Sequence, residues 1–256
     1  METRLSHRSW LREGNHESHE IALTKLVLVR VASWTVFLNC ELPRSIQVLS
    51  DVEVLLMITA EAAAQFNLYL VKSFFDVSTC HQIIAELSRS PVARATTYGR
   101  SESGYVDETV RRTTQVKPST ETVELVKKRL SDRRAEIGGH FGISLGNIEE
   151  PQFLRYCVGD FFVAHQDGNT GLLRLDREQS RKVSIIIFLN YQSEAPEAGA
   201  YGGGSLVFSE WRPGRTAGEL RLSGEAGTLA AFPSDTTHEV IPVIHGERYS
   251  IVSWYG

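Results

Sequence analysis

The sequence predicts a mainly β fold with flanking helices, an α+β arrangement with an antiparallel jelly roll at its core. After Glu150, short runs of β-branched and aromatic residues alternate with turn signals, which is typical of double-sheet proteins. The run from Val183 to Leu189 is almost continuously apolar, as expected of a strand buried on both faces. Two segments before Glu150 show the apolar spacing of amphipathic helices, so helices are expected beside the jelly roll.

The chain is expected to divide near residue 60. Residues 1–60 mix His-rich polar sequence with β-like runs and predict a poorly ordered N-terminal extension, while residues 61–256 predict the folded domain, with its jelly-roll core at about 150–256. Met57 is the only methionine besides Met1. The sequence therefore leaves open whether residues 1–60 are part of the native protein.

A strand and a helix are predicted at the start of the domain. The sequence from Asn67 to Val71 has the composition of a strand. The helix is predicted from Thr79 to Ser88, where Asp76 or Ser78 can accept hydrogen bonds from its first backbone N–H groups. Its apolar residues recur at helical spacing, so one face is expected to pack against the sheet.

A second helix is predicted after Pro118, with Ser119 or Thr120 as its N-cap. Gly138-Gly139 is expected to end it. Between the two helices, the segment from Tyr98 to Val116 is polar and rich in Thr and Arg, which predicts a long loop that covers the substrate. Further loops, expected to set substrate selectivity, are Gly168 to Gln179, Glu194 to Gly204 and Glu210 to Gly218.

Charge and cysteine content restrict the functional classes. The net charge of −4 gives no overall attraction to nucleic acid or membranes, so neither is expected as a partner. The local basic groups Arg111-Arg112, Lys127-Lys128-Arg129 and Arg133-Arg134 are interpreted as solvated surface. Cysteines are few and scattered, which favours a reducing, cytoplasmic location; they are Cys40, Cys80 and Cys157, the last expected to be a small core residue.

No membrane-spanning segment is expected. The stretch from Leu23 to Leu38 is apolar overall, but Lys25 and Arg30 interrupt it. A spanning helix needs roughly 20 residues that are largely uncharged. Acidic residues in the first 20 positions also argue against a signal peptide.

The most informative motif is His165-Gln166-Asp167 together with the distant His238. Two imidazoles and one carboxylate are the ligand set of a facial iron(II) site, which leaves coordination positions open for oxygen chemistry. Residues i and i+2 of a strand point to the same side, so His165 and Asp167 are expected to bind one ion together. By itself the motif is weak, because such pairs often arise by chance.

The surrounding residues strengthen it. In order, the chain carries Tyr156, Gly159, His165-Gln166-Asp167, the glycine run Gly202-Gly203-Gly204 before Phe208, Gly227 before Phe232, His238, Pro242-Val243, Gly246 before Arg248, and Trp254. With this order, residues from about Glu150 to Gly256 resemble the 2-oxoglutarate (2OG) and iron(II)-dependent dioxygenases of the prolyl 4-hydroxylase superfamily. The resemblance implies a double-stranded β-helix (jelly roll) buttressed by N-terminal helices.

The resemblance also implies roles for individual residues. His165, Asp167 and His238 would be the catalytic metal ligands, and Arg248 would bind the distal carboxylate of 2OG through its planar fork of N–H groups. Ser250, two residues further along the same strand, and Tyr156 would add donors to this cosubstrate.

The chain departs from its relatives at one position. Many of them place a tyrosine where this sequence has Phe188, which cannot donate a hydrogen bond. Arg181 matches an arginine of relatives, and the sequence leaves open whether it has a role or is a surface charge.

The implied activity is hydroxylation of an unactivated C–H bond, with release of succinate and CO₂. A prolyl residue in a protein or peptide is the best-known target of the superfamily, and a related amino acid or other small molecule is the alternative. Fe(II), 2OG and O₂ would be required, with ascorbate as a candidate reductant. Two other classes remain open at this point: a catalytically silent relative that acts as a metal-dependent sensor, and a jelly-roll binding module with incidental histidines. The sequence leaves the oligomeric state undetermined.

Overall fold

The computed structural model describes residues 64–256 except 97–104, 169–179 and 211–217, together with two short strands near the N-terminus. The chain divides into two units, Met1–Ser50 and Asp51–Gly256. In the first unit, strands β1 (Val27–Val31) and β2 (Trp34–Leu38) form an antiparallel hairpin. The expected boundary near residue 60 lies outside the described residues.

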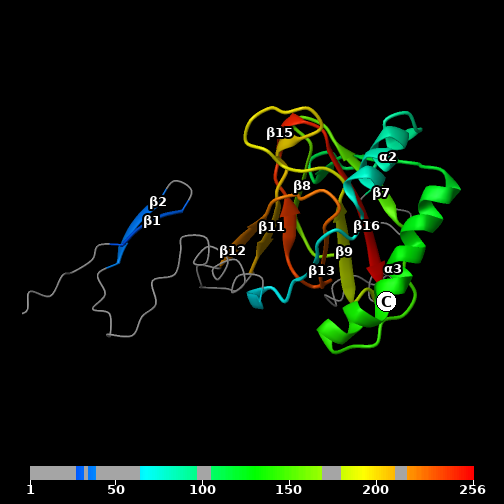
Figure 1. The fold of residues 1–256 in the computed structure, drawn as a ribbon, viewed down its shortest axis with the longest axis horizontal. Helices are drawn as coiled ribbons and strands as arrows, with labels where there is room; N and C mark the ends of the chain where they lie inside the picture. Colours follow the sequence, from blue (N-terminus) through cyan, green and yellow to red (C-terminus); the bar gives the residue numbers. More distant parts are fainter. Residues whose placement is uncertain (1–26, 32–33, 39–63, 97–104, 169–179, 211–217) are drawn as a thin grey trace, which may run out of the picture. The chain divides into compact units, whose positions relative to one another are not determined.

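The second unit is built on two antiparallel sheets (Figure 1). The seven-stranded sheet has the order β3 (Tyr69–Val71), β13 (Leu229–Pro233), β9 (Val183–Phe188), β16 (Arg248–Tyr255), β7 (Gln152–Tyr156), β6 (Thr114–Val116) and β4 (Val92–Arg94). The five-stranded sheet has the order β12 (Glu219–Leu222), β11 (Leu206–Ser209), β14 (His238–Val240), β8 (Phe161–His165) and β5 (Arg111–Arg112). A two-stranded sheet pairs β10 (Tyr201–Gly203) with β15 (Val243–Gly246). The predicted jelly roll is confirmed.

Strand β9 separates two hydrophobic cores. Its residues are all buried, because successive side chains point to opposite faces and both faces are covered. Ile186 and Phe188 join a core shared with residues of the five-stranded sheet, such as Leu206 and Phe208. Ile185 and Ile187 join the other core, on the outer face of the seven-stranded sheet. The continuous apolar run of the sequence is therefore explained by burial on both faces, as predicted.

Two helices cover that outer face. Helix α2 (Val77–Leu87) begins at Asp76, whose side chain accepts a hydrogen bond from the Thr79 backbone N–H at 2.7 Å. Helix α3 (Thr120–Phe141) begins at Ser119, which caps it in the same way. Both helices bury their apolar stripes in the core that contains Ile185 and Ile187; the buried helix residues are Cys80, Ile83, Leu87, Val126, Leu130 and Ile137. Both predicted helices are thus observed.

The predicted end of α3 is wrong. The helix continues through Gly138-Gly139 and ends at Gly142, which adopts the left-handed conformation with φ 66°. The Ile143 backbone N–H then donates to the Gly138 carbonyl at 3.0 Å. Gly138 is required for close packing and not for termination: a Cβ at this position would lie 2.8 Å from the Ile143 carbonyl oxygen.

The predicted long loop from Tyr98 to Val116 is also wrong in its second half. Residues 97–104 lie outside the described residues, but β5 and β6 follow, and each extends a different sheet. Arg111 is therefore not solvated surface: its exposed fraction is 9%. Of the other expected loops, Gly168 to Gln179 and Glu210 to Gly218 lie largely outside the described residues, and Glu194 to Gly204 contains β10.

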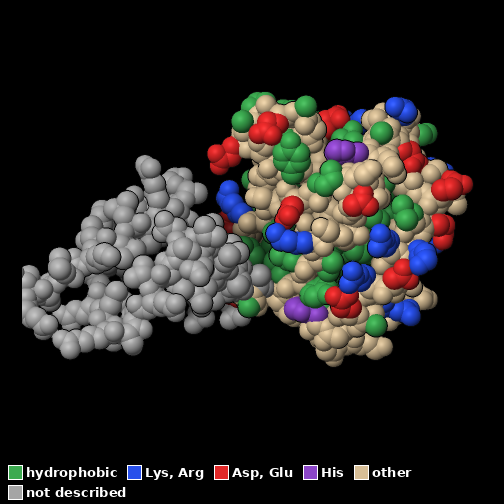
Figure 2. Space-filling model, viewed as in Figure 1, with side chains coloured by type: hydrophobic (Ala, Val, Ile, Leu, Met, Phe, Trp, Pro, Cys, Tyr) green, Lys and Arg blue, Asp and Glu red, His purple; other side chains and the backbone are tan. Residues whose placement is uncertain are grey.

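Two further expectations concern surface and thiols. The basic residues of α3 are solvated as predicted, with ion pairs such as Lys128–Asp132 and Arg133–Glu136 on the exposed face. On the face shown in Figure 2, basic and acidic side chains are interspersed.

Cys157 is not a core residue, because it follows the end of β7 and is partly exposed. Among the described helices, none combines the length and the apolar character needed to cross a membrane.

The two glycines of α3 provide a matched test of packing. Gly138→Ala should lower the free energy of unfolding by about 1–3 kcal/mol, because the new methyl group collides with backbone. Gly139→Ala, which meets nothing within 4 Å, should raise it by roughly 0.5–1 kcal/mol through helix propensity. Urea denaturation followed by circular dichroism measures both, and equal changes in the same direction would contradict this account of the helix end.

Candidate metal and cosubstrate site

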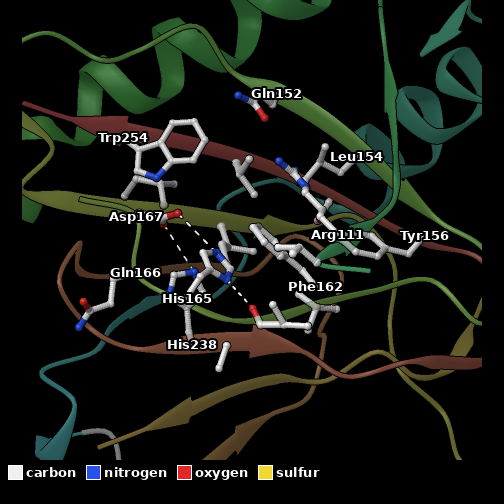
Figure 3. A pocket seen from close by; sticks show the side chains of 18 of the residues that line it. Arg111, Gln152, Leu154, Tyr156, Phe162, His165, Gln166, Asp167, His238 and Trp254 are labelled. Atoms are coloured by element: carbon white, nitrogen blue, oxygen red, sulfur yellow. Dashed lines mark hydrogen bonds and ion pairs between the residues drawn. The ribbon is translucent and has the colours of Figure 1, made fainter. Parts of the chain in front are cut away.

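Strand pairing brings the three predicted metal ligands together. His165 is the last residue of β8 and His238 the first of β14, and the two lie directly opposite each other in the antiparallel register. Asp167 lies two residues beyond the end of β8, where its backbone N–H donates to Ser234 O at 2.9 Å. The expectation that one strand carries both His165 and Asp167 is therefore only half right. One ligand atom from each of the three lies within 4.8 Å of the others (Figure 3).

Hydrogen bonds fix which nitrogen of each imidazole faces the centre. His165 Nδ1 lies 2.8 Å from the Val163 carbonyl oxygen, and His238 Nδ1 lies 2.9 Å from that of Thr236. A carbonyl oxygen only accepts hydrogen bonds, so each Nδ1 carries a hydrogen, and in the neutral ring the free lone pair is then on Nε2. These lone pairs are on the side of Asp167, with Nε2–Oδ distances of 3.6 Å for His165 and 3.5 Å for His238.

The protonation states suit a divalent cation. Burial lowers the pKa of His238 to about 4, with a further contribution from nearby His165, so its ring is neutral at pH 7. Burial alone would raise the pKa of Asp167, but His238, His165 and the Ser184 hydroxyl together hold it far below its usual range. Ser184 Oγ donates to Asp167 Oδ2 at 2.7 Å. An ionised carboxylate and a neutral imidazole are the forms in which Asp and His bind metal, and Asp167 and His238 are in these forms.

Arg181 positions the acidic ligand. It is buried, forms two hydrogen bonds to Glu149 at 2.6 and 2.8 Å, and donates to the Asp167 carbonyl oxygen at 3.2 Å. Its guanidinium also lies over the Trp254 ring, 3.8 Å from the centroid. The surface-charge interpretation of Arg181 is therefore wrong. Glu149 and Ser184 were missed, because nothing in their local sequence indicates that folding places them beside Arg181 and Asp167.

Arg248 is a buried cation without a protein counterion. It lies on β16, opposite Tyr156 of β7, with an exposed fraction of 1%. Its Nη1 donates to Ser250 Oγ at 2.8 Å, but its Nε and Nη2 have no hydrogen-bond partner. Within the described part of the chain, no acidic side chain forms an ion pair with it. Since a buried charge is normally paired, this guanidinium is suited to an anionic ligand.

Aromatic rings surround the guanidinium of Arg248. The Arg248 Cζ lies 5.0 Å from the ring centroid of Tyr156, 5.4 Å from that of Phe188 and 6.0 Å from that of Tyr201. Phe188, where many relatives have a tyrosine, thus places beside Arg248 a ring that cannot donate a hydrogen bond. Tyr201, which the sequence analysis did not single out, has a buried hydroxyl with no hydrogen-bond partner, and burial raises its pKa.

One pocket of about 270 Å³ joins the two groups of residues. Its lining includes the triad, Arg248 with Ser250 and Tyr156, and aliphatic residues such as Ile186 and Val252. The residues fit iron(II) and 2OG, because the triad offers three ligand atoms and the unpaired Arg248 offers a carboxylate site within the same pocket.

Comparison with known proteins agrees with this geometry. Residues 151–256 match a family model that is described as the 2OG-Fe(II) oxygenase superfamily. Over this C-terminal range, the chain is similar to that superfamily. All six residues predicted from the sequence for the metal and cosubstrate sites lie within the matched range.

Two bacterial hydroxylases are also similar to the chain. A PKHD-type hydroxylase of Burkholderia thailandensis is 29% identical over 158 residues, which cover 61% of this chain and 65% of the relative. A PKHD-type hydroxylase of Shewanella oneidensis is 35% identical over 109 residues, which cover 41% of each chain. The matched part thus spans less than two thirds of the length of either relative.

Two solved structures of prolyl hydroxylases share the fold. A Pseudomonas putida prolyl-4-hydroxylase superposes with a TM-score of 0.56 at 22% identity, covering 78% of this chain and 97% of that one. A Trichoplax adhaerens prolyl hydroxylase, solved with a peptide fragment of hypoxia inducible factor, superposes with a TM-score of 0.57 at 15% identity, covering 79% and 89%. At these identities the likeness establishes the fold.

The buried ion pair between Arg181 and Glu149 gives a test of its contribution to stability. Glu149→Gln should lower the free energy of unfolding by about 3 kcal/mol, because it leaves a buried guanidinium without its charged partner. Glu219→Gln, which removes the exposed pair with Arg221, should cost less than about 1 kcal/mol. Denaturant titration of both variants measures the difference, and similar values would show that Arg181 does not depend on Glu149.

Proposed function

We propose that the chain is a 2OG- and Fe(II)-dependent dioxygenase that hydroxylates an unactivated C–H bond, of a prolyl residue or a related amino-acid substrate, with release of succinate and CO₂. One observation carries the proposal: the His165, Asp167 and His238 triad shares a pocket with Arg248, a buried cation that has no partner among the described acidic side chains. A closed structural metal site would not require an unpaired guanidinium in the same pocket.

Each residue has a separate task. His165, Asp167 and His238 would hold the iron on one face, with Ser184 and Arg181 keeping Asp167 in place through its side chain and carbonyl. Arg248 and Ser250 would bind the distal carboxylate of 2OG, with Tyr156 beside them. Iron and 2OG supply the oxidising chemistry when bound. The apolar walls would exclude water from the reacting centre.

The cosubstrates and location follow from the same reasoning. The family supports Fe(II) and 2OG, O₂ is the general oxidant of such chemistry, and ascorbate is proposed as the reductant that restores ferrous iron. A peptide substrate is suggested by the Trichoplax relative, which was solved with a peptide fragment. The cysteines of the described residues, Cys80 and Cys157, are free, which supports a reducing compartment such as the cytoplasm.

Removal of a histidine tests the metal site. His165→Ala and His238→Ala should each weaken Mn(II) binding by more than about 100-fold and abolish succinate formation, because each removes one of three ligands. His140→Ala, on the exposed end of α3, is the matched control and should leave binding unchanged. Isothermal titration calorimetry measures the affinity, and unchanged binding in either site variant would remove the metal site from the proposal.

Substitution of Arg248 tests the cosubstrate site. Arg248→Met should weaken 2OG binding to the Mn(II)-loaded protein by about 100-fold, or roughly 3 kcal/mol, while Mn(II) affinity is retained. Arg221→Met, which removes an exposed guanidinium, is the control. Equal 2OG affinity in the wild type and Arg248→Met would place the cosubstrate elsewhere.

Turnover itself decides the activity. Peptidyl-proline, free amino acids and a cell extract are each incubated with the protein, Fe(II), 2OG and ascorbate, and mass spectrometry detects a single added oxygen. The proposal expects one product whose formation matches that of succinate. Binding of metal and 2OG without succinate formation from any substrate would favour the silent sensor instead.

A further inference from the structure

A second guanidinium enters the same pocket from the opposite sheet. Arg111 lies on β5, at the edge of the five-stranded sheet, with its Cα opposite that of Phe162 on β8. It lines the pocket together with the triad and Arg248. Figure 3 shows its side chain beside Phe162 and Leu154. Arg111 precedes residues 151–256, the range that the family model matches.

Arg111 is buried and only partly satisfied. One of its nitrogens, Nη1, donates to the Thr96 carbonyl oxygen at 2.9 Å, which fixes the orientation of the guanidinium. Its Nε is buried and has no hydrogen-bond partner. Among the residues that the structure describes, no acidic side chain forms an ion pair with Arg111. By contrast, the third arginine of the pocket, Arg181, is fully engaged by Glu149.

The ring of Phe162 links Arg111 to the metal site. Arg111 Cζ lies 4.8 Å from the Phe162 ring centroid. The same ring stacks on the His165 imidazole, with centroids 3.6 Å apart and planes 18° apart. The guanidinium is therefore separated from a metal ligand by a single aromatic ring, and a group bound to it lies within the length of a small molecule from the reacting centre.

The pocket thus contains two buried guanidiniums with unpaired nitrogens, Arg248 on one sheet and Arg111 on the other. The distal carboxylate of 2OG accounts for one of them. With Nη1 held by Thr96, the Nε side of Arg111 remains, and this edge of a guanidinium binds a carboxylate through two parallel hydrogen bonds. A neutral carbonyl would satisfy the hydrogen bond but would leave the buried charge without a counterion.

We propose that Arg111 binds a carboxylate of the primary substrate, so that the enzyme selects an acid-bearing amino acid or peptide and presents a C–H bond near that carboxylate to the iron. The inference rests on the proposed function, since it names the substrate class of the same pocket. It assigns selectivity to a strand that precedes the oxygenase motifs, and it separates substrate recognition on the five-stranded sheet from cosubstrate recognition on the seven-stranded sheet.

The test uses binding to the full-length protein loaded with Mn(II) and 2OG, which cannot turn over. Calorimetry compares the twenty common amino acids as N-acetyl acids, which keep the carboxylate, with the corresponding N-acetyl amides, which lack it. The wild type should bind at least one acid tenfold or more tightly than its amide. Arg111→Met should remove that preference, and Arg111→Lys should restore part of it.

Arg112→Met is the matched control, because Arg112 is the exposed neighbour on the same strand. It should retain the preference for the acid. In Arg111→Met, 2OG affinity should equal that of the wild type, whereas in Arg248→Met it should fall. Thermal unfolding of each variant verifies folding, and if Arg111→Met does not fold, Arg111→Gln replaces it.

Two outcomes would overturn the inference. If no acid binds more tightly than its amide, Arg111 does not select a carboxylate. If Arg111→Met weakens 2OG as strongly as Arg248→Met does, Arg111 belongs to the cosubstrate site. Failure of the proposed function would give a different result, because the wild type would then bind no 2OG in the presence of Mn(II).

Discussion

The antiparallel register between β8 and β14 is the constraint on which the site depends. It places His165 opposite His238, so two imidazoles that are 73 positions apart in sequence lie with their ring centroids 4.3 Å apart. A shift of one residue would turn one of the rings to the other face of the sheet and separate the two imidazoles. The same register sets Nε2 of both rings toward Asp167, which the chain reaches immediately after β8 ends. The metal site is therefore a property of strand pairing.

Buried charge is the second constraint on the site. Three guanidiniums line one pocket, and their partners differ: Arg181 is paired with Glu149, Arg248 has only a serine hydroxyl, and Arg111 has only a backbone carbonyl. Unpaired buried charges reduce stability unless something compensates them. The fold tolerates two of them beside a potential metal centre, which is the arrangement expected of a protein whose anionic ligands complete the site.

Much of this was predictable from the sequence. The jelly roll and both helices follow from local pattern, which gave Asp76 and Ser119 each as one of two candidate caps. The triad and Arg248 were expected from the order of motifs and the family resemblance that it carries. Local pattern could not predict that Gly138 packs against the Ile143 carbonyl instead of ending α3, because that contact depends on where the chain turns afterwards. For the same reason the polar, Thr- and Arg-rich sequence around Arg111 resembled a loop, although edge pairing with β8 makes it a strand. Glu149 and Ser184 acquire their roles only through contacts made by folding.

The central claim is that one pocket, lined by both the triad and Arg248, holds a divalent metal and a keto acid together. A crystal structure of the protein with Mn(II) and 2OG tests it most directly. We expect Mn(II) bound to Nε2 of His165 and His238 and to a carboxylate oxygen of Asp167, with the distal carboxylate of 2OG against Arg248 and Ser250. A metal bound elsewhere, or 2OG bound away from Arg248, would contradict it.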